Sequence, residues 1–513
     1  MTMRQICLLT ALSLFMMMVN IDYTAVNLAL VTIASDIGSH LNQVQWLLSG
    51  YVLAWAALLI PGGKLADIKG RKRLALIGLI LFILGSLVTG VGQVFWVLVA
   101  GRVLQGAAGA VVIPTVYSFI HANFNKQYLG IALGIVSLGI GLGMALGPTF
   151  GGIMLTYISW RWIFFINVPL GLFVAGLVHW SAREEVVSPE QSLDLLSASL
   201  LGMAIIAMLL AIGQLHNSAA HSNYFYFWLV TSSISLLVFI QRQKQATQPL
   251  IVFSIFKNRN FITSSTALAI EQFCFTSVVI MMALYLQEIH GYSVLMSSMI
   301  FLPLSLMTGV ISPFGGKLVA KFGFKKPSLW GSLILIVGLF GLTTLRYDSP
   351  LLGIVTWLLV TGAGMGIMLT ALQTGILATV DEQQVGVASA IFILFALLGN
   401  AIGVLISTLI YEKATSATLM TVLYHNLSAL TASQLRQIEQ LVTNIGNHVY
   451  VLSTFSSSMQ QHITAAIPTA LTNGLIRVMT INMGLIFVVS IMLLFMVREQ
   501  RETRDDTSIH VKV

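Results

Sequence analysis

Long apolar runs dominate the chain, and short charged or turn-forming clusters separate them. Most runs have about 20 residues or more, the length at which an α-helix crosses a hydrocarbon layer ~30 Å thick. The pattern predicts fourteen membrane-spanning helices, and this even number places both termini on the same side of the membrane. The predicted spans lie at about residues 6–30, 44–62, 74–94, 96–119, 128–156, 161–181, 193–213, 224–241, 261–286, 295–316, 328–345, 350–378, 386–411 and 474–497.

The composition agrees with a membrane protein, because 57% of the residues are hydrophobic and 9% are charged. Soluble domains carry about 25% charged residues. Basic residues gather in loops on one side of the predicted spans, above all in segments 64–73 and 317–326. Since cytoplasmic loops are enriched in Lys and Arg, we expect a multi-pass protein of a bacterial cell membrane with both termini in the cytoplasm. The net charge of +8 therefore marks a membrane face, and no nucleic acid partner is expected.

A duplicated loop indicates that the chain contains two related halves. Residues 62–72 align without gaps on residues 315–325, and both copies follow a predicted span. The sequence therefore predicts an all-α integral membrane protein with two six-helix bundles related by pseudo-symmetry and two inserted helices. The predicted division is an N-terminal bundle at 1–184, two inserted helices at 185–258 and a C-terminal bundle at 259–513. Duplicated bundles of this kind hold the substrate path at their interface.

One long segment, residues 412–473, separates the last two predicted spans on the outer side of the membrane. Within it, Thr431 and Gln434 fit a capping box, and apolar residues at helical spacing continue to Ile445 before Gly446. The pattern predicts an amphipathic helix outside the membrane. Such a helix packs on the protein's own outer surface or, as the alternative, forms a docking site for a periplasmic adaptor protein.

Two acidic residues, Asp22 and Glu271, lie well inside predicted spans. Ionisable side chains within a membrane are costly, so each of them is a functional hypothesis by default. A buried carboxyl group that binds and releases a proton is what a proton-coupled carrier requires. We therefore predict that Asp22 and Glu271 take up the coupling protons, and the alternative is a structural hydrogen bond between helices.

Arg102 is the one basic residue well inside a predicted span, and a buried guanidinium group needs a partner. At ~1.5 Å per residue, Arg102 lies about 10 Å below the outer surface and Asp22 about 12 Å below it. The two side chains can therefore meet. We predict a polar network in which Arg102, with Gln105 one helical turn deeper, modulates the proton affinity of Asp22.

The fifth predicted span carries a glycine at every fourth position from 139 to 151, followed by Gly152. A glycine face lets another helix approach backbone to backbone, and Pro148 adds a kink. The pattern indicates a close helix contact that serves a conformational change. Generic packing of small residues is the alternative.

The sequence shows no pattern typical of an enzyme or of a bound cofactor. The glycine-rich segments lack the strand or the Ser/Thr of nucleotide-binding loops, and the two cysteines are far apart. We therefore expect the proton gradient to supply the energy. An apolar cavity would bind the substrate, and its aromatic rings would contact a cation. The candidate substrate-binding residues are Tyr51, Trp55, Asn27 and Phe273; rings that merely face lipid or core are the alternative.

Five segments together resemble the major facilitator superfamily, specifically its fourteen-span drug:proton antiporters of the EmrB/QacA type. Residues 63–73 resemble the signature loop between spans 2 and 3, residues 102–109 the motif of span 4, and residues 143–152 the antiporter motif of span 5. Residues 22–30 and 160–171 resemble the motifs of spans 1 and 6 in the fourteen-span group. The resemblance implies the major facilitator fold.

The resemblance also implies roles for individual residues. It places Arg102 in the proton path. Span 13 contains no carboxylate, which disfavours divalent cationic drugs, and Ala320 occupies the position of Asp67 in the second loop, which makes the gate asymmetric. The residues implied to control gating, at the cytoplasmic ends or at the interface of the halves, are Gly63, Asp67, Gly70, Arg71, Gly143, Gly147, Pro148, Gly151 and Gly152.

The predicted function is proton-coupled export of small hydrophobic or cationic toxic compounds, as in a multidrug efflux antiporter without enzymatic activity. The expected partners are the small-molecule substrate, protons and the lipid bilayer. One alternative is a proton-coupled exporter or symporter of a specific metabolite, siderophore or nutrient. Another is the membrane component of a larger envelope-spanning efflux assembly.

Overall fold

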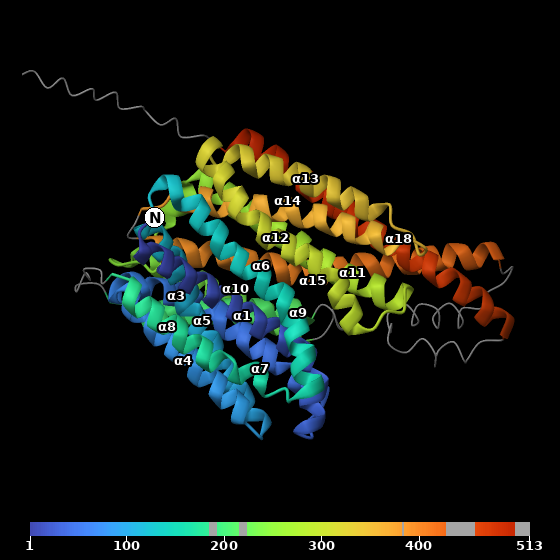
Figure 1. Cartoon of the computed structure of the whole chain (residues 1–513), viewed down its shortest axis with the longest axis horizontal. Helices are drawn as coiled ribbons and strands as arrows, with labels where there is room; N and C mark the ends of the chain where they lie inside the picture. The colour runs from blue at the N-terminus through green and yellow to red at the C-terminus, as the bar shows by residue number, and fades with distance from the viewer. Residues whose placement is uncertain (184–191, 215–222, 382–383, 427–456, 498–513) are drawn as a thin grey trace, which may run out of the picture.

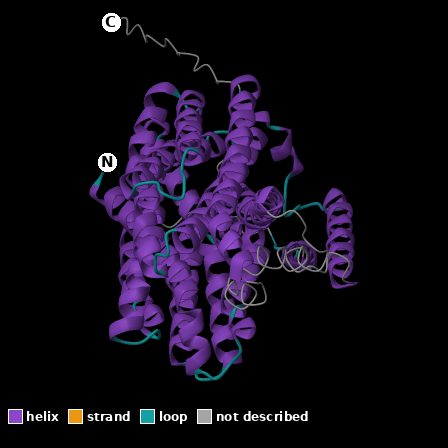
Figure 2. Ribbon diagram, turned by 90° about the vertical axis from the view of Figure 1, so that its right-hand side faces the viewer, coloured by secondary structure: helices purple, strands orange, loops and turns teal. Residues whose placement is uncertain are grey.

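The computed structural model describes residues 1–183, 192–214, 223–381, 384–426 and 457–497. These residues form helices joined by short loops, and no strand occurs among them (Figure 2). Fourteen helical segments are long and apolar enough to cross a membrane, which confirms the predicted spans. Helices suit this solvent because each backbone N–H and C=O is satisfied within its own segment.

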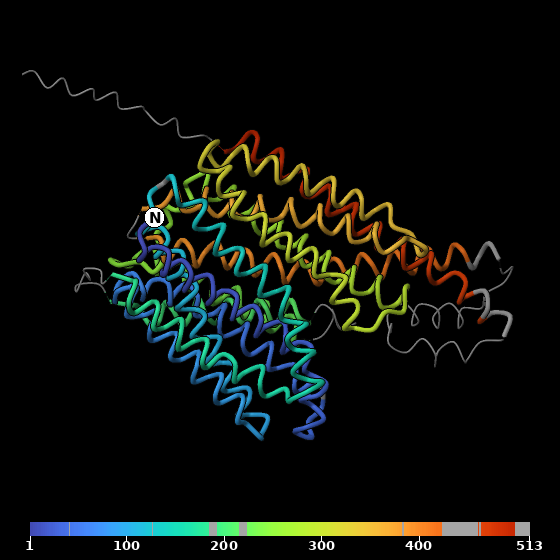
Figure 3. The backbone as a smooth tube through the Cα atoms, viewed as in Figure 1, coloured from blue at the N-terminus to red at the C-terminus, as the bar shows by residue number. Residues whose placement is uncertain are grey.

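The first half of the chain forms one bundle, in which α1 packs against α6, and α5 packs against α3 and α4 (Figure 3). The sixth span is broken into two helices, α7 and α8. The elements of this half are α1 (Met3–Asp36), α2 (Leu41–Val44), α3 (Trp46–Lys69), α4 (Arg71–Val91), α5 (Phe95–Asn123), α6 (Lys126–Tyr157), α7 (Trp162–Phe165) and α8 (Asn167–Ser181).

The second half forms another bundle, in which α14 packs against α12 and α13, and α15 packs against α11. The end of its first span is a π-helical turn, η2. The elements of this half are η1 (Phe253–Lys257), α11 (Arg259–Leu284), η2 (Tyr285–Ile289), α12 (Val294–Phe322), α13 (Lys325–Thr343), α14 (Leu351–Leu377), α15 (Val385–Asn426) and α18 (Ser457–Met496).

Two helices, α9 (Leu195–Gln214) and α10 (Asn223–Gln245), lie between the halves in the sequence. α10 packs mainly against α9, whereas α9 contacts α3 of the first half and α15 of the second. An ion pair between Arg242 and Asp194, with Nε and Oδ2 3.0 Å apart, joins the two helices at one end. The division of the chain into bundles at 184 and 258 stays a prediction.

Each of the duplicated loops contains a glycine of positive φ, which supports the sequence repeat. Gly70 ends α3 with φ of 93°, and Gly323, 253 positions later, ends α12 with φ of 73°. Such φ values suit glycine, which carries no Cβ. Equivalent glycines therefore stop equivalent helices in the two halves.

The two halves meet closely near the N-terminus and diverge toward the opposite end (Figure 1). At the closed end, α6 and α12 are so close that a Cβ on Gly316 would meet the backbone of Gly130. A Cβ on Gly63 in α3 would likewise meet the carbonyl oxygen of Gly386 in α15. Backbone-to-backbone contacts of this kind need glycine and hold this end of the bundle pair shut.

The last two spanning helices are longer than the sequence pattern predicted. α15 continues to Asn426 instead of ending near residue 411, and α18 begins at Ser457 instead of near residue 474. Outside lipid a helix does not need a continuous apolar run, so hydropathy misses these extensions, which belong to the segment 412–473. The predicted amphipathic helix at 431–446 lies outside the described residues.

Candidate functional site

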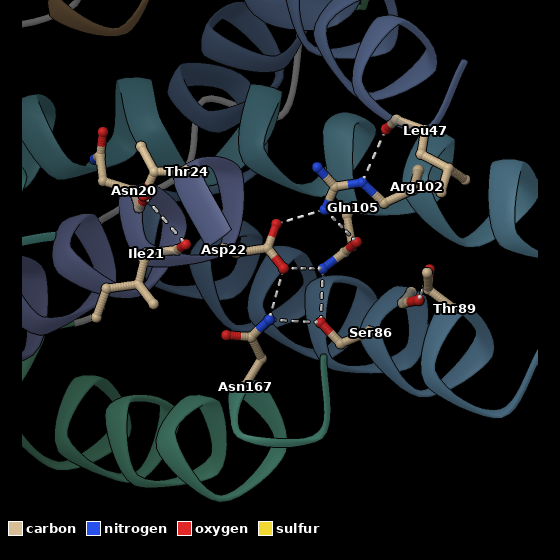
Figure 4. A network of polar contacts seen from close by, with 11 residues as sticks. Asn20, Ile21, Asp22, Thr24, Leu47, Ser86, Thr89, Arg102, Gln105 and Asn167 are labelled. Atoms are coloured by element: carbon tan, nitrogen blue, oxygen red, sulfur yellow. Dashed lines mark hydrogen bonds and ion pairs between the residues drawn. The ribbon is translucent and has the colours of Figure 1, made fainter. Parts of the chain in front are cut away.

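Asp22 lies at the centre of a buried polar network inside the N-terminal bundle (Figure 4). Arg102 of α5 donates from Nη1 to Asp22 Oδ2 and to Gln105 Oε1, the latter at 2.9 Å. Arg102 Nε also donates to the carbonyl oxygen of Leu47, at 3.0 Å. Asp22, Arg102 and Gln105 have no exposed surface, so the predicted Asp22–Arg102–Gln105 network is present.

Three further side chains complete the network around Asp22. Asn167 Nδ2 donates to Asp22 Oδ1 at 2.9 Å, and Gln105 Nε2 donates to Ser86 Oγ at 2.7 Å. The guanidinium carbon of Arg102 lies 4.3 Å from the centre of the Tyr51 ring, a cation–π contact. Such partners offset the cost of burying the ion pair in a region of low dielectric.

Asn167 follows Ile166, the residue between α7 and α8, whose backbone stays helical with φ of −62° and ψ of −28°. α7 ends at Phe165 and α8 begins at Asn167, which faces Asp22 (Figure 4). The loop before α7 is tied to the end of α1, because Arg161 Nη1 donates to Asp36 Oδ2 at 2.6 Å. Trp160 Nε1 donates to the same oxygen at 3.0 Å. The segment 160–167 therefore holds Asn167, one of the hydrogen-bond donors to Asp22, in place.

Among the described residues, a cavity lies between the halves, toward the diverging end. It has a volume of about 310 Å³, and α1 and α6 line it from one half while α11, η2 and α12 line it from the other. Asn27 and Pro148 are among its walls, as are Phe275 and Gln287. This volume lies at the lower end of the range of small-molecule sites.

Glu271 lies one helical turn deeper than the cavity, on the same face of α11. Phe275, Val279 and Ala283 follow it at intervals of four residues and line the cavity. Glu271 itself is 1% exposed, and its Oε2 has no hydrogen-bond partner among the described residues. A buried, unsatisfied carboxyl oxygen is costly, and a bound proton would relieve that cost.

The two carboxyl groups do not share one cavity. Asp22 faces the interior of the N-terminal bundle, whereas Thr24 and Asn27 on the same helix line the cavity. The reason is helical geometry, because at 100° per residue a shift of two positions turns a side chain to the opposite side. Glu271 is thus the carboxyl group beside the cavity, and Asp22 acts within one half.

Of the four predicted substrate-binding residues, Asn27 alone is in the cavity wall as the structure describes it. Tyr51 is buried against Arg102, and Trp55 packs beside it, with ring centres 6.2 Å apart. Phe273 turns toward α15, where its backbone meets Gly403. These three rings do not line this cavity, and their role in substrate binding stays a prediction.

A close contact at the closed end joins α3 to the start of α15. The Asp67 carboxylate lies 3.9 Å from Nε of Arg71, and both of its oxygens lie within 2.7 Å of where a Cβ on Gly386 would come. Gly386 is in the first turn of α15, whose positive helix-dipole end attracts a carboxylate. The predicted gating residues Gly63, Asp67 and Arg71 are therefore together at one contact between the halves.

A second contact across the closed end is polar and buried. Ser137 Oγ of α6 donates to Gln373 Oε1 of α14 at 3.3 Å, and Gln373 Nε2 donates to the Tyr117 hydroxyl of α5 at 3.4 Å. The Tyr117 ring also packs edge-on against Phe392 of α15, with ring centres 5.0 Å apart. These bonds have to break before the closed end can open.

The glycine face of α6 packs inside its own half rather than on the other half. Cβ atoms on Gly143, Gly147 and Gly151 would meet Met17, Thr24 and Ala25 of α1, respectively. Gly152 lies nearer to Leu295 of α12. The helix as a whole does lie at the interface, because its other faces contact α12. The implied placement of these glycines at the interface therefore holds for the helix but not for three of the residues.

Comparison with known proteins identifies the family. A family model described as Major Facilitator Superfamily matches residues 10–404, more than half of the chain. The chain belongs to the Major Facilitator Superfamily. It is an integral, multi-pass membrane protein and a non-enzymatic transporter.

Curated members of the superfamily are similar to this chain over most of its length. The tetracenomycin C resistance and export protein of Streptomyces glaucescens is 30% identical over 386 residues, which cover 75% of this chain and 71% of that protein. The multidrug resistance protein Stp of Mycobacterium tuberculosis is 27% identical and covers 81% and 77%. The solved human organic anion transporter MFSD10 has a TM-score of 0.58 at 13% identity, over 96% and 100% of the two chains, and shows the fold alone.

Several site residues of this superfamily member were not predicted from the sequence. Asn167 and Ser86 in the Asp22 network are neutral, so the search for ionisable groups passed over them. Gln373 and Gln287 are amides inside or at the end of apolar runs, and that rarity is the signal that would have found them.

Replacing Asp67 tests the gate of this transporter. Asp67→Asn removes the charge that faces Arg71 and the first turn of α15, so the closed end is expected to open more often. With Cys7 and Cys274 replaced by serine, Ser389→Cys serves as a buried reporter in α15. Its reaction with a membrane-impermeant maleimide should accelerate by about five- to thirtyfold, which corresponds to 1–2 kcal/mol for a partly buried charge at a helix end.

The matched control for the gate is Asp348→Asn, an exposed carboxylate in the loop between α13 and α14. It should leave the maleimide rate unchanged. An unchanged rate in Asp67→Asn as well would show that the carboxylate does not hold the closed end.

Proposed function

We propose that this chain is a proton-driven exporter of small, largely hydrophobic toxic compounds, a multidrug efflux antiporter of the EmrB/QacA type. The observation that carries the proposal is the cavity between the halves with the buried Glu271 one turn beyond it. The named functions of its relatives, tetracenomycin C resistance and export and multidrug resistance, support the same conclusion.

Proton coupling rests on two separate carboxyl groups. A proton on Glu271 would neutralise the buried charge one helical turn beneath the cavity. A proton on Asp22 would compete with Arg102, so its uptake would loosen the contact between α1 and α5. One proton moving through ~100 mV supplies about 2.3 kcal/mol, and each pH unit adds about 1.4.

We further propose that the closed end faces the cytoplasm of a bacterial cell. The N-terminus and the basic loops that follow α3 and α12 are at that end, which agrees with the enrichment of Lys and Arg in cytoplasmic loops. In this orientation the cavity belongs to an outward-facing state. The extensions of α15 and α18 would then project outward, where an adaptor protein could bind them.

The proposal is tested in inverted membrane vesicles with an imposed proton gradient. Adding a transported compound should release protons from vesicles that contain the natural chain. Asp22→Asn should abolish this release, because an amide cannot carry the proton, and release is compared per molecule of folded protein in the vesicles because the variant leaves Arg102 without its counter-charge. Continued coupled release in Asp22→Asn would leave Glu271 as the proton carrier.

The double variant Asp22→Asn/Glu271→Gln distinguishes coupling through Glu271 alone from coupling that involves neither carboxyl group. Coupled release that persists in Asp22→Asn/Glu271→Gln would overturn proton coupling through these residues. The direction of substrate flux in the same vesicles separates export from nutrient symport.

A further inference from the structure

Four polar side chains in the cavity wall are neutral and form no hydrogen bond with the described part of the protein. Asn27 and Gln287 present side-chain amides, and Ser297 and Ser305 present hydroxyl groups, all in the cavity wall. Within the described residues none of these four side chains takes part in a hydrogen bond, although Ser297 is only 3% exposed. Ser305 is 2% exposed as well, whereas Gln287 is half-buried and Asn27 is exposed. Buried polar groups are normally paired, so the unpaired, buried hydroxyl of Ser297 in the cavity wall points to a ligand.

Other polar side chains of the same helices already form hydrogen bonds with the backbone. The Thr24 hydroxyl donates to the carbonyl oxygen of Asn20 at 2.7 Å, and the Ser298 hydroxyl donates to that of Val294 at 2.8 Å. These bonds lie within single helices. The four free groups are therefore a distinct set, and their amides and hydroxyls can both donate to and accept from a ligand.

The remaining wall of the cavity is apolar and partly aromatic. Phe275 and Phe301 contribute rings from the C-terminal half, and Met144 and Leu28 face them from the N-terminal half. Methionine and aromatic side chains pack well against flat ring systems. The surface thus suits a planar, mostly apolar molecule with a few oxygen atoms.

The cavity offers no charge to a cationic ligand. None of the described residues that line it is ionisable. Glu271 is one turn deeper, behind Phe275, and is not part of the wall. Moving a cation from water into such a site is unfavourable unless a counter-charge pairs with it.

We propose that the cavity selects neutral, flat, oxygen-bearing aromatic compounds over cations of the same shape. This inference rests on the proposed export function and narrows its substrate class. Asn27 and Gln287 would bind carbonyl or hydroxyl oxygens, and Ser297 would donate from its buried hydroxyl. The aromatic ring system of the ligand would lie against Phe275 and Phe301.

A matched pair of dyes tests the selection by charge. Nile red and Nile blue share one benzophenoxazine ring system, but Nile red is neutral with a carbonyl group and Nile blue is cationic at pH 7. Binding to the purified full chain in nanodiscs is measured by dye fluorescence. Nile red is expected to bind at least about tenfold more tightly than Nile blue. Tighter binding of Nile blue, or binding of neither dye, would overturn the inference.

Neighbouring serines test the assignment of the polar groups. Ser297→Ala should weaken Nile red binding by about three- to tenfold, the range for one lost hydrogen bond, and Asn27→Leu should act similarly. Ser298→Ala removes a hydroxyl already bonded in its own helix and should change affinity less than twofold. Equal effects of Ser297→Ala and Ser298→Ala would reject the free hydroxyl as a ligand-binding group.

Transport by the same protein separates this inference from the proposed function. Gradient-driven export of Nile blue but not Nile red would sustain the export function and overturn the neutral selectivity. Binding of Nile red with the expected effects of the variants, but no transport of any compound in energised vesicles, would sustain the selectivity and overturn the export function.

Discussion

Arg102→Ala is expected to lower the free energy of unfolding by about 3–5 kcal/mol, the largest stability effect foreseen for any single substitution in this chain. Asp22 and Arg102 are fully buried, so truncating the arginine leaves a carboxylate without its main partner. Asn167 and Gln105 would remain as neutral donors. Unfolding of the purified protein by denaturant in detergent measures the change.

A double-mutant cycle separates the ion pair from simple loss of packing. Asp22→Asn added to Arg102→Ala removes the orphaned charge and should restore a large part of the lost stability. The control is Arg161→Ala, which breaks the partly exposed pair with Asp36 and should cost about 0–1 kcal/mol. If Arg161→Ala and Arg102→Ala lower the free energy of unfolding by similar amounts, the buried Asp22–Arg102 pair contributes no more to stability than the partly exposed pair does.

Glu271→Gln is expected to abolish uphill transport while leaving exchange of substrate intact. With ~100 mV across the membrane, one coupled proton sustains roughly a fiftyfold gradient of a neutral compound. The glutamine keeps the size and polarity of the side chain but cannot bind and release a proton. Accumulation in energised vesicles should therefore fall to equal concentrations, whereas exchange of labelled for unlabelled substrate without a gradient should continue.

The matched control for this prediction is Glu288→Gln, an exposed carboxylate on η2 that follows the same helix. It should keep the full substrate gradient. If Glu271→Gln accumulates substrate as well as the natural chain does, the carboxyl group beneath the cavity has no part in coupling.

The fold was largely predictable because a hydrocarbon layer fixes the length and polarity of a spanning helix. All fourteen spans follow from this single constraint. The ends of α15 and α18 did not, because beyond the lipid a helix needs no apolar run. Hydropathy detects only the part of a helix that lies in the membrane, so it does not predict where the helix ends outside the membrane.

The Asp22–Arg102 pair was predictable because each buried charge needs a counter-charge and the depth of each residue can be counted along its helix. Asn167 was not, because a neutral side chain carries no charge that calls for a partner. The cavity wall was not predictable either. A helix that is apolar on every side carries no periodic signal for the face that turns inward, so the sequence could not tell that Tyr51 packs against Arg102.

The face of α9 between the two halves has a mechanical consequence. This helix contacts α3 on one side and α15 on the other, and its buried positions include Gly202, Ala204 and Ala207. Two larger side chains, Leu201 and Ile205, are buried on α9 as well. As the halves rock, small shear displacements of α3 along α9 are therefore expected to meet least hindrance at Gly202, which lies against Ala57 of α3, while the inserted pair stays in place beside both halves.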